Sequence, residues 1–292
     1  MRVVAIGDNC LDWYLDRRMV HPGGNALNVA VYCHRLGADA AYIGQFGTDW
    51  AGDVMIHALE AEGVDISRIR RTHGTSGYAT NGNVAGDRVF RGSSNGVVAF
   101  LPTQRDYASM VGADVIHTGD SSFLEEHVAD FAALAPVSYD FSTKPAGYCE
   151  PLLRHVTFAT FSRPGLSPGQ VEELIGWASG HGAREVHVTQ GEAGSFSYAD
   201  GHLHHEPAAA VGRIVDTLGA GDSFIAGMLV ARLGGASVPE AARAASSFAA
   251  ASCRVLGAFG YGEPATPMST APDHRYASSD NHVEQPRKEE HR

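Results

Sequence analysis

The residues best suited to chemistry lie in a glycine-rich run at 214–224. There the sequence Ile-Val-Asp-Thr-Leu-Gly-Ala-Gly-Asp-Ser-Phe passes from a short apolar run into an amphipathic helical pattern. Small residues at a helix start let backbone N–H groups approach an anion closely, and the helix dipole favours negative charge there. The sequence therefore predicts an anion pocket formed by Gly219, Ala220 and Gly221.

A carboxylate stands inside this predicted anion pocket. Asp222 would repel the phosphate that the loop attracts. Its position makes sense if it accepts a proton from a nucleophile that attacks that phosphate. The alternative is that Asp222 only caps the helix after a glycine-rich turn.

Polar side chains near the N-terminus are candidates for holding hydroxyl groups. Asp8 and Asp12 follow the strand-like run Val3–Ile6, and Asn28 lies in a helical pattern that begins after Gly24. Carboxylate and amide groups can bind several hydroxyls at once. The alternative for the aspartates is a turn after the first strand. Asparagine is a poor helix former, and the alternative for Asn28 is a solvent-facing helix position.

Four further polar residues leave two interpretations each. Asn25 either caps its helix or serves the site, and His117, at the end of a buried strand, faces the site or is simply buried. Arg88 contacts a sugar conjugate or phosphate, or is solvated on a hairpin. Lys144 reaches a phosphate or is likewise solvated.

The elements that must position these residues alternate along the chain. The strand-like runs are Val3–Ile6, Ala41–Phe46, Val115–Thr118, Val137–Phe141 and Glu185–Thr189. Helical patterns lie between them, and those at Asn25–Leu36 and Trp50–Glu62 each end before a glycine. Continuous apolar strands separated by helices predict an α/β fold with a mostly parallel sheet covered on both faces.

Three segments depart from this alternation. Between 75 and 100, the runs Tyr78–Val84 and Arg88–Arg91 flank a turn at 85–87, which predicts a small inserted antiparallel sheet. A second hairpin, Phe196–Tyr198 with Leu203–His205, is expected at the edge of the main sheet. Residues 263–292 lack apolar periodicity and are expected to form a disordered tail.

Composition narrows the class of partner. A net charge of −11 argues against nucleic acid or an anionic membrane surface as a partner. No run of about eighteen apolar residues is present, so we expect no membrane span. The scattered cysteines favour reduced thiols and a cytoplasmic location; they are Cys10, Cys33, Cys149 and Cys253.

Three motifs occur in the order typical of one enzyme family. Residues 23–30 read Gly-Gly-Asn-Ala-Leu-Asn-Val-Ala, 188–195 read Val-Thr-Gln-Gly-Glu-Ala-Gly-Ser, and 216–222 read Asp-Thr-Leu-Gly-Ala-Gly-Asp. Together they resemble the ribokinase-like sugar kinases over about residues 1–262. The segments 7–12, 87–90 and 140–142 are most similar to the fructoselysine 6-kinase branch of that family.

The resemblance implies a three-layer α/β/α sandwich over residues 1–262, with a small β-sheet lid from 75–100. It implies ATP-dependent phosphorylation of a sugar hydroxyl, with Asp222 as the general base and Gly219, Ala220 and Gly221 as the anion hole. Implied substrate positions are Asp12, Gly24 and Asn28, with Asp8 and Arg88 as further candidates. Implied ATP-side positions are Thr189, Gly191, Gly194 and Ser246. Asp216 and the Leu218 carbonyl match a monovalent-cation site, for K⁺, seen in part of the family.

One departure concerns magnesium. Many family members carry an Asn-x-x-Glu motif that organises the water around Mg²⁺, whereas residues 162–165 here read Ser-Arg-Pro-Gly. We therefore expect Mg²⁺ to be held mainly by substrate phosphates and water.

The expected substrate is a fructosamine such as fructoselysine, phosphorylated at its 6-hydroxyl. One alternative is a fructokinase or another ribokinase-like kinase of a plain sugar or nucleoside. Another is a catalytically silent sugar-binding regulatory protein, which the intact 219–222 run disfavours. A homodimer paired through the lid is also expected.

Overall fold

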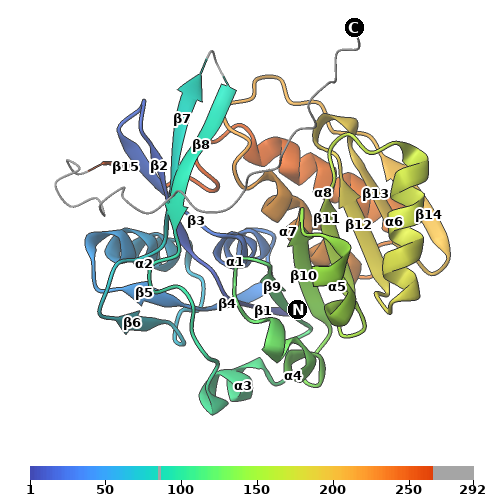
Figure 1. Cartoon of the computed structure of the whole chain (residues 1–292), viewed down its shortest axis with the longest axis horizontal. Coiled ribbons are helices and arrows are strands. Elements are labelled where there is room, and N and C mark those ends of the chain that lie inside the picture. Colours follow the sequence, from blue (N-terminus) through green and yellow to red (C-terminus); the bar gives the residue numbers. More distant parts are fainter. Residues whose placement is uncertain (85–86, 266–292) are drawn as a thin grey trace, which may run out of the picture.

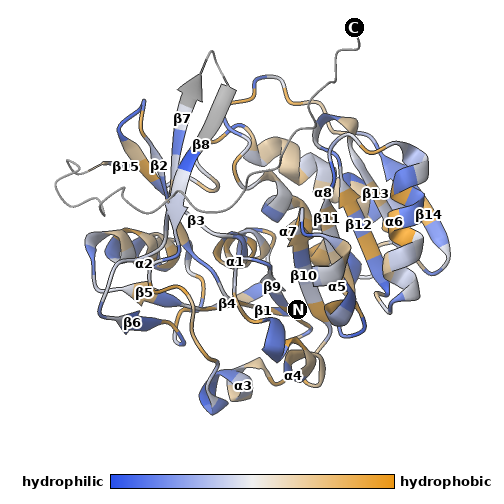
Figure 2. Cartoon of the chain, viewed as in Figure 1, coloured by the Kyte–Doolittle hydropathy of each residue, from blue (hydrophilic) through white to orange (hydrophobic). Residues whose placement is uncertain are grey.

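The chain folds into a large sheet between two helical layers, with a smaller sheet against one side (Figure 1). This computed structural model describes residues 1–84 and 87–265. Figure 2 shows apolar residues concentrated in the central strands, between the layers. None of the helices in that part of the chain is long and apolar enough to cross a bilayer.

The main sheet has eight strands in the order β14-β13-β12-β11-β10-β9-β1-β4. The strands from β4 to β12 in this order run parallel, and β13 and β14 form an antiparallel hairpin at the edge. The mostly parallel sheet and its edge hairpin are thus confirmed. The strands are β1 Arg2–Ile6, β4 Asp39–Ile43, β9 Val115–Gly119, β10 Val137–Ser142, β11 Phe158–Ser162, β12 Glu185–Thr189, β13 Ser195–Ala199 and β14 His202–Glu206.

Two details of the main sheet differ from expectation. The expected single strand Ala41–Phe46 is two elements, because Gly44 separates β4 from β5, Gln45–Gly47, which pairs with β6, Arg70–Thr72. The structure also adds β11, which the apolar pattern did not single out. Its polar residues Thr160 and Ser162 interrupt the apolar run.

Alternate side chains of β1 enter different cores. Val3 and Ala5 pack with α1, α2 and α7, whereas Val4 and Ile6 pack with α3 to α6 on the opposite face. This is the three-layer sandwich that the sequence predicted. The first layer holds α1 Asn25–Arg35, α2 Trp50–Glu62, α7 Ala220–Leu233 and α8 Val238–Ser252, and the second holds α3 Gln104–Met110, α4 Val128–Ala132, α5 Ala146–Leu153 and α6 Pro168–Gly180.

The smaller sheet, here called the lid sheet, has the strand order β15-β3-β2-β7-β8. Its strands are β2 Cys10–Tyr14, β3 Met19–Gly23, β7 Tyr78–Val84, β8 Asp87–Ser94 and β15 Glu263–Pro264. The sequence predicted only the antiparallel β7–β8 hairpin, and Asp12 lies in strand β2 rather than in the turn that was the alternative for it. The sequence pattern did not predict this strand, because the charged residue Asp12 interrupts the short apolar run between Leu11 and Trp13.

The C-terminal segment was expected to be disordered from residue 263. Glu263 and Pro264 instead pair with Val20 and Met19 of β3, so the folded part extends beyond the expected boundary at 262. Residues 266–292 and the side chain of Arg88 lie outside the described residues, and the predictions for them stay predictions.

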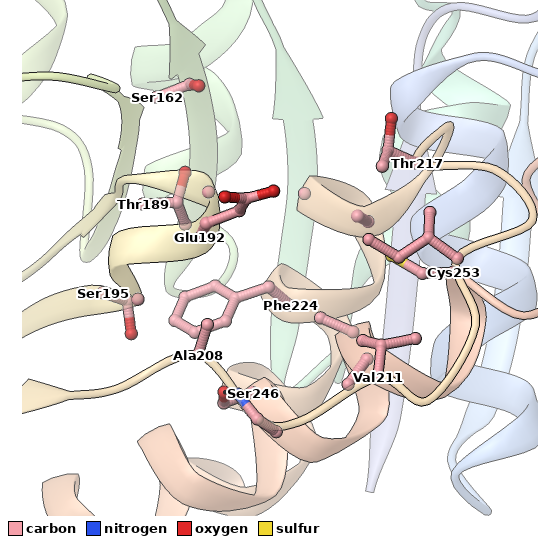
Figure 3. A pocket seen from close by; sticks show the side chains of 18 residues that line it. Ser162, Thr189, Glu192, Ser195, Ala208, Val211, Thr217, Phe224, Ser246 and Cys253 are labelled. Atoms are coloured by element: carbon pink, nitrogen blue, oxygen red, sulfur yellow. Dashed lines mark hydrogen bonds between the residues drawn. The ribbon is translucent and has the colours of Figure 1, made fainter. Parts of the chain in front are cut away.

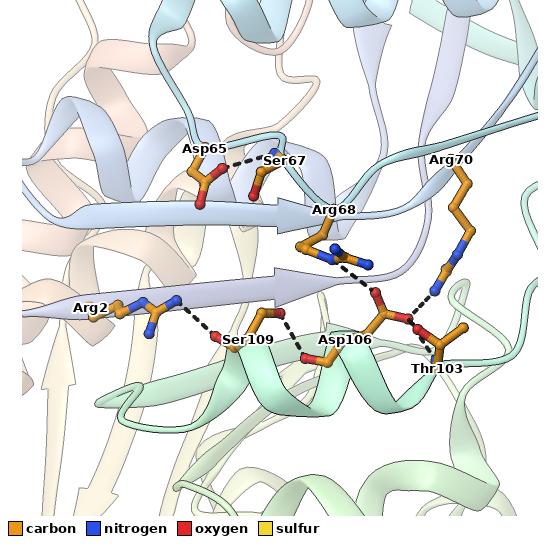
Figure 4. A network of polar contacts seen from close by, with 8 residues as sticks. All are labelled: Arg2, Asp65, Ser67, Arg68, Arg70, Thr103, Asp106 and Ser109. Carbon is orange, nitrogen blue, oxygen red and sulfur yellow. Dashed lines mark hydrogen bonds and ion pairs between the residues drawn. The ribbon is translucent and has the colours of Figure 1, made fainter.

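A buried carboxylate anchors the chain where it returns from the lid sheet to the main sheet. Asp106 accepts hydrogen bonds from the Thr103 backbone N–H and hydroxyl, each at 2.6 Å, and pairs with Arg70 (Figure 4). The Nε atom of Arg68 lies 3.5 Å from the other carboxylate oxygen. The side chain of Asp106 is fully buried, so these groups replace the water that it loses.

Removing this carboxylate should destabilise the fold strongly. We expect Asp106→Ala to lower the free energy of unfolding by about 2–4 kcal/mol, because two arginines lose their counter-ion. Asp53→Ala is the matched control, since Asp53 is exposed in its pair with Arg71 and should cost at most about 1 kcal/mol. Urea unfolding of the three proteins measures the difference, and equal losses in both variants would contradict this role.

Candidate active site

The predicted anion pocket forms at the start of α7. Gly219 has a left-handed backbone with φ of 75°, and a Cβ there would lie 2.8 Å from the Tyr32 hydroxyl and from the Ala258 Cβ. Glycine is therefore the residue that fits. The N–H groups of Gly221 and Asp222 lie in the first helical turn, where the helix itself offers no acceptor. They are available to an anion.

The Asp222 carboxylate is held by two amides of α1. Asn25 Nδ2 donates to Oδ1 at 2.8 Å and Asn28 Nδ2 donates to Oδ2 at 2.6 Å. Burial raises the pKa of Asp222 to about 6, although the two hydrogen bonds oppose that rise. Asp222 is thus ionised at neutral pH, and its pKa is close enough to neutral pH for the carboxylate to accept a proton.

A buried histidine fixes the orientation of Asn25. His117 Nε2 lies 3.0 Å from Asn25 Oδ1, and His117 Nδ1 lies 3.0 Å from the Ser138 hydroxyl. Burial lowers the pKa of His117 to about 3, so the ring is neutral. Because an amide oxygen can only accept, Nε2 carries the proton and Ser138 donates to Nδ1. The Asn25 amide nitrogen is thereby turned toward the carboxylates.

A second carboxylate shares the Asn25 amide. Asn25 Nδ2 also donates to Asp140 Oδ2 at 3.0 Å, and the Ser142 N–H donates to Asp140 Oδ1 at 2.8 Å. Burial, followed by the nearby charge of Asp222, raises the pKa of Asp140 to about 8. At neutral pH Asp140 is therefore mostly protonated, and Asp222 carries the negative charge of the pair.

Asp8 serves the start of α1. Its carboxylate accepts from the backbone N–H groups of Asn25 at 2.7 Å and Ala26 at 3.1 Å, and from the Ser122 hydroxyl at 3.1 Å. These contacts give Asp8 a capping role, and its candidate contact with the sugar stays a prediction. Gly24 supports the same junction, because a Cβ there would lie 2.5 Å from the Asn9 Cα.

Asp12 projects from the lid sheet. It is buried and accepts a hydrogen bond from Asn81 Nδ2 at 3.2 Å. A Cβ at Gly23 would lie 2.5 Å from Asp12 Oδ2, so glycine makes room for this carboxylate. Strand β3 runs from this sheet straight into α1, which links Asp12 to the helix that carries Asn28.

Asn28 is buried, contrary to the solvent-facing alternative. Its amide nitrogen is taken by Asp222, while its Oδ1 atom has no hydrogen-bond partner among residues 1–84 and 87–265. A buried acceptor of this kind calls for a donor from a ligand or from water.

A cavity of about 510 Å³ opens beside the start of α7 (Figure 3). It brings together all four residues expected on the ATP side, namely Thr189, Gly191, Gly194 and Ser246, with Ala220 and Gly221 of the anion pocket. Ser246 is engaged within the protein, since its hydroxyl accepts from the Ala209 N–H at 2.9 Å and donates to the Pro207 carbonyl at 3.1 Å. Ser246 thus supports the segment that lines the cavity, and its expected position on the adenine side stays a prediction.

Much of the apolar lining was not identified from the sequence. It comes from the 207–211 segment, from α8 and from the residue that follows α8, which carry no motif; these residues are Ala208, Val211, Ala249, Ala250 and Cys253.

The expected monovalent-cation site is occupied by protein donors. Asp216 accepts from the Leu218 N–H at 3.1 Å, from the Gly257 N–H at 3.0 Å and from the Tyr14 hydroxyl. These donors use three of the roughly four lone-pair sites of the carboxylate, so the protein itself satisfies most of the acceptor that a cation would need.

The segment that stands in place of the Asn-x-x-Glu motif carries a cation of its own, Arg163. Arg163 donates to the carbonyl oxygens of Ser142 and Lys144, so it braces the loop after β10. Lys144 pairs with Asp120 at 3.6 Å. The described residues contain no group of three or more His, Cys, Asp or Glu side chains suited to a metal.

Comparison with known proteins agrees with this geometry. The pfkB family of carbohydrate kinases matches residues 4–261. Fructosamine kinase FrlD of Bacillus subtilis is 40% identical over 270 residues, which cover 90% of this chain and 95% of that protein. Fructoselysine 6-kinase of Escherichia coli is 34% identical over 264 residues, which cover 88% and 99%.

Solved structures share the fold. Arabidopsis thaliana ribokinase, complexed with ribose and ATP, superposes with a TM-score of 0.76 at 19% identity, covering 88% of this chain and 94% of that one. Aminoimidazole riboside kinase from Salmonella enterica gives a TM-score of 0.74 at 19% identity, with coverage of 89% and 95%. The chain therefore belongs to the pfkB family of carbohydrate kinases and is an ATP-dependent sugar kinase.

Proposed function

We propose that this kinase phosphorylates a fructosamine such as fructoselysine at its 6-hydroxyl, with Asp222 as the general base. The observation that carries the proposed role is the Asp222 carboxylate, which two amides hold beside the N–H groups that begin α7. The substrate class is supported by the two relatives that match nearly their whole length, both of which are named for fructosamine substrates.

In the proposed reaction, the sugar hydroxyl oxygen attacks the γ-phosphorus of ATP. The bond from that phosphorus to the β–γ bridging oxygen breaks, ADP leaves, and the hydroxyl proton passes to Asp222. The N–H groups of Gly221 and Asp222, with the positive end of the α7 dipole, stabilise the charge on the transferred group. Gly219 and Ala220 set the backbone that presents them.

Sugar recognition is assigned to groups on both sides of Asp222. The unpartnered Asn28 Oδ1 would accept a hydrogen bond from a sugar hydroxyl, and Asp12 would hold a second hydroxyl from the lid sheet. Arg88, on the hairpin of that sheet, stays our candidate for the carboxylate of the amino-acid substituent. Gly24 contributes by allowing the close approach that starts α1.

ATP is proposed to occupy the cavity beside α7. Thr189, Gly191 and Gly194 would face the nucleotide, and Ala220 and Gly221 would receive the phosphates, since all of them line one space. Mg²⁺ would supply charge neutralisation on the phosphates. With no cluster of metal-ligating side chains in the described part of the chain, phosphate oxygens and water would hold it.

A plain ketohexose is the second candidate substrate. Fructokinase of Klebsiella pneumoniae is 28% identical over 269 residues, covering 82% of this chain. The cytoplasmic location and a homodimer paired through the lid sheet also stay predictions, the latter to be tested by light scattering.

A substrate panel decides between the two candidates. Fructoselysine, other fructosamines, fructose and ribose are each supplied with ATP and Mg²⁺. The release of ADP gives the rate, and ³¹P NMR of the product gives the position of the phosphate. The proposal requires the highest kcat/KM with a fructosamine and a phosphate on its 6-oxygen. A preference for free fructose or ribose would overturn the substrate assignment.

Loss of the proposed base should act on the chemical step. We expect Asp222→Asn to lower kcat by about 10²–10⁴-fold, because the variant cannot accept the proton. ATP affinity measured by calorimetry should stay within about tenfold of wild type, since the side chain keeps its size. Retention of more than about a tenth of the wild-type rate would remove Asp222 from this role.

The pH profile should report the ionisation of Asp222. Burial raises its pKa to about 6. Since only the ionised carboxylate accepts a proton, kcat/KM should fall about tenfold per pH unit below pH ~6. Initial rates between pH 4.5 and 8.5, at saturating ATP, measure this. A profile that stays flat down to pH 4.5 would place the acid limb near the ordinary aspartate pKa, about 3.9, and would contradict the proposed environment.

A further inference from the structure

The lid sheet makes a buried hydrogen bond to the segment that begins the anion pocket. Tyr14 of β2 is buried, and its hydroxyl donates to Oδ2 of Asp216. Asp216 Oδ1 accepts from the Leu218 N–H at 3.1 Å, directly before Gly219. The tyrosine is therefore two hydrogen bonds away from the turn that presents the N–H groups of α7.

A third segment, residues 257–260, also contacts Asp216 and the lid sheet. The Gly257 N–H donates to the same Asp216 oxygen at 3.0 Å. His21 of β3 packs edge-on against the Tyr14 ring, with centroids 5.3 Å apart, and its Nδ1 lies 3.3 Å from the Gly260 carbonyl oxygen. Gly257 has φ of 72°, and a Cβ there would lie 2.4 Å from His21 Nδ1, so the three segments fit without spare room.

Asp12 and Tyr14 connect this contact to the sugar side. They lie two residues apart in β2 and so share one face of the strand. Asn81, which donates to Asp12, is the β7 partner of Tyr14 in the sheet register. A ligand that contacts Asp12 would therefore contact the same strand that carries Tyr14.

We propose that Tyr14 is a positioning residue that couples the lid sheet to the anion pocket, and that its hydroxyl holds Asp216 in place of a monovalent cation. This inference rests on the proposed function for its kinetic consequences only. When a sugar orders β2, Tyr14 holds Asp216, and Asp216 sets Leu218 and Gly219 so that the N–H groups of Gly221 and Asp222 meet the phosphate. Sugar and nucleotide should then strengthen each other's binding by the same factor.

The first test removes only the hydroxyl. Tyr14→Phe should lower kcat by about tenfold or more, the size expected from losing one hydrogen bond to a charged group, with a smaller change in the KM for sugar. Tyr198→Phe is the matched control, because Tyr198 lies in the edge hairpin strand β13, and it should behave as wild type. Circular dichroism verifies that both variants are folded.

The second readout is the coupling itself. Calorimetry with a non-hydrolysable ATP analogue, with and without the best sugar of the panel, should show tighter binding with sugar in wild type and in Tyr198→Phe. The gain should disappear in Tyr14→Phe. Wild-type kinetics and coupling in Tyr14→Phe would overturn the proposal, because a residue that only fills space would move neither readout.

The third readout uses the unmodified enzyme. Its melting temperature and its rate should be the same in KCl, NaCl and tetramethylammonium chloride of equal ionic strength. A stabilisation or a tenfold activation specific to K⁺ would show that a cation holds Asp216, and would overturn the proposal even if Tyr14→Phe failed to fold. If no sugar in the panel is phosphorylated, the proposed function fails, and melting in the three salts still decides whether Asp216 binds a cation.

Discussion

The two hydrogen bonds from α1 to Asp222 are the interaction on which the rest of the site depends. A carboxylate at the positive end of a helix would ordinarily cap that helix, and the anion pocket would then be blocked. Asn25 and Asn28 instead hold the carboxylate, and the N–H groups of the α7 turn stay open to a second anion. Burial keeps the pKa of Asp222 near 6, where a proton can be accepted and released.

Holding two asparagines in place takes support from several strands of the main sheet. Asp8, after β1, caps α1 through the Asn25 and Ala26 N–H groups. His117 in β9 accepts a hydrogen bond from the Ser138 hydroxyl in β10 and orients Asn25. These strands are adjacent and parallel, so their carboxyl ends meet at one edge of the sheet. The position of a single proton acceptor is thus fixed by the topology of the sheet.

The sequence predicted the parts of the site that glycine and motif spacing determine. The 216–222 run and the alternation of apolar strands with helices are local patterns. The ATP-side residues followed from the resemblance to the sugar kinases, and the structure brings them into one cavity. Contacts between residues far apart in the chain could not be predicted from local sequence patterns. Tyr14 and Asp216 are far apart in sequence, and His117 in an apolar run is the kind of signal that indicates a buried network without naming its partner.

A crystal structure with fructoselysine and a non-hydrolysable ATP analogue tests the central claim most directly. The account predicts the sugar 6-hydroxyl within hydrogen-bond distance of the Asp222 carboxylate, with the γ-phosphate against the N–H groups of Gly221 and Asp222. A 6-hydroxyl that contacts Asp140 instead, with Asp222 still held only by Asn25 and Asn28, would contradict it.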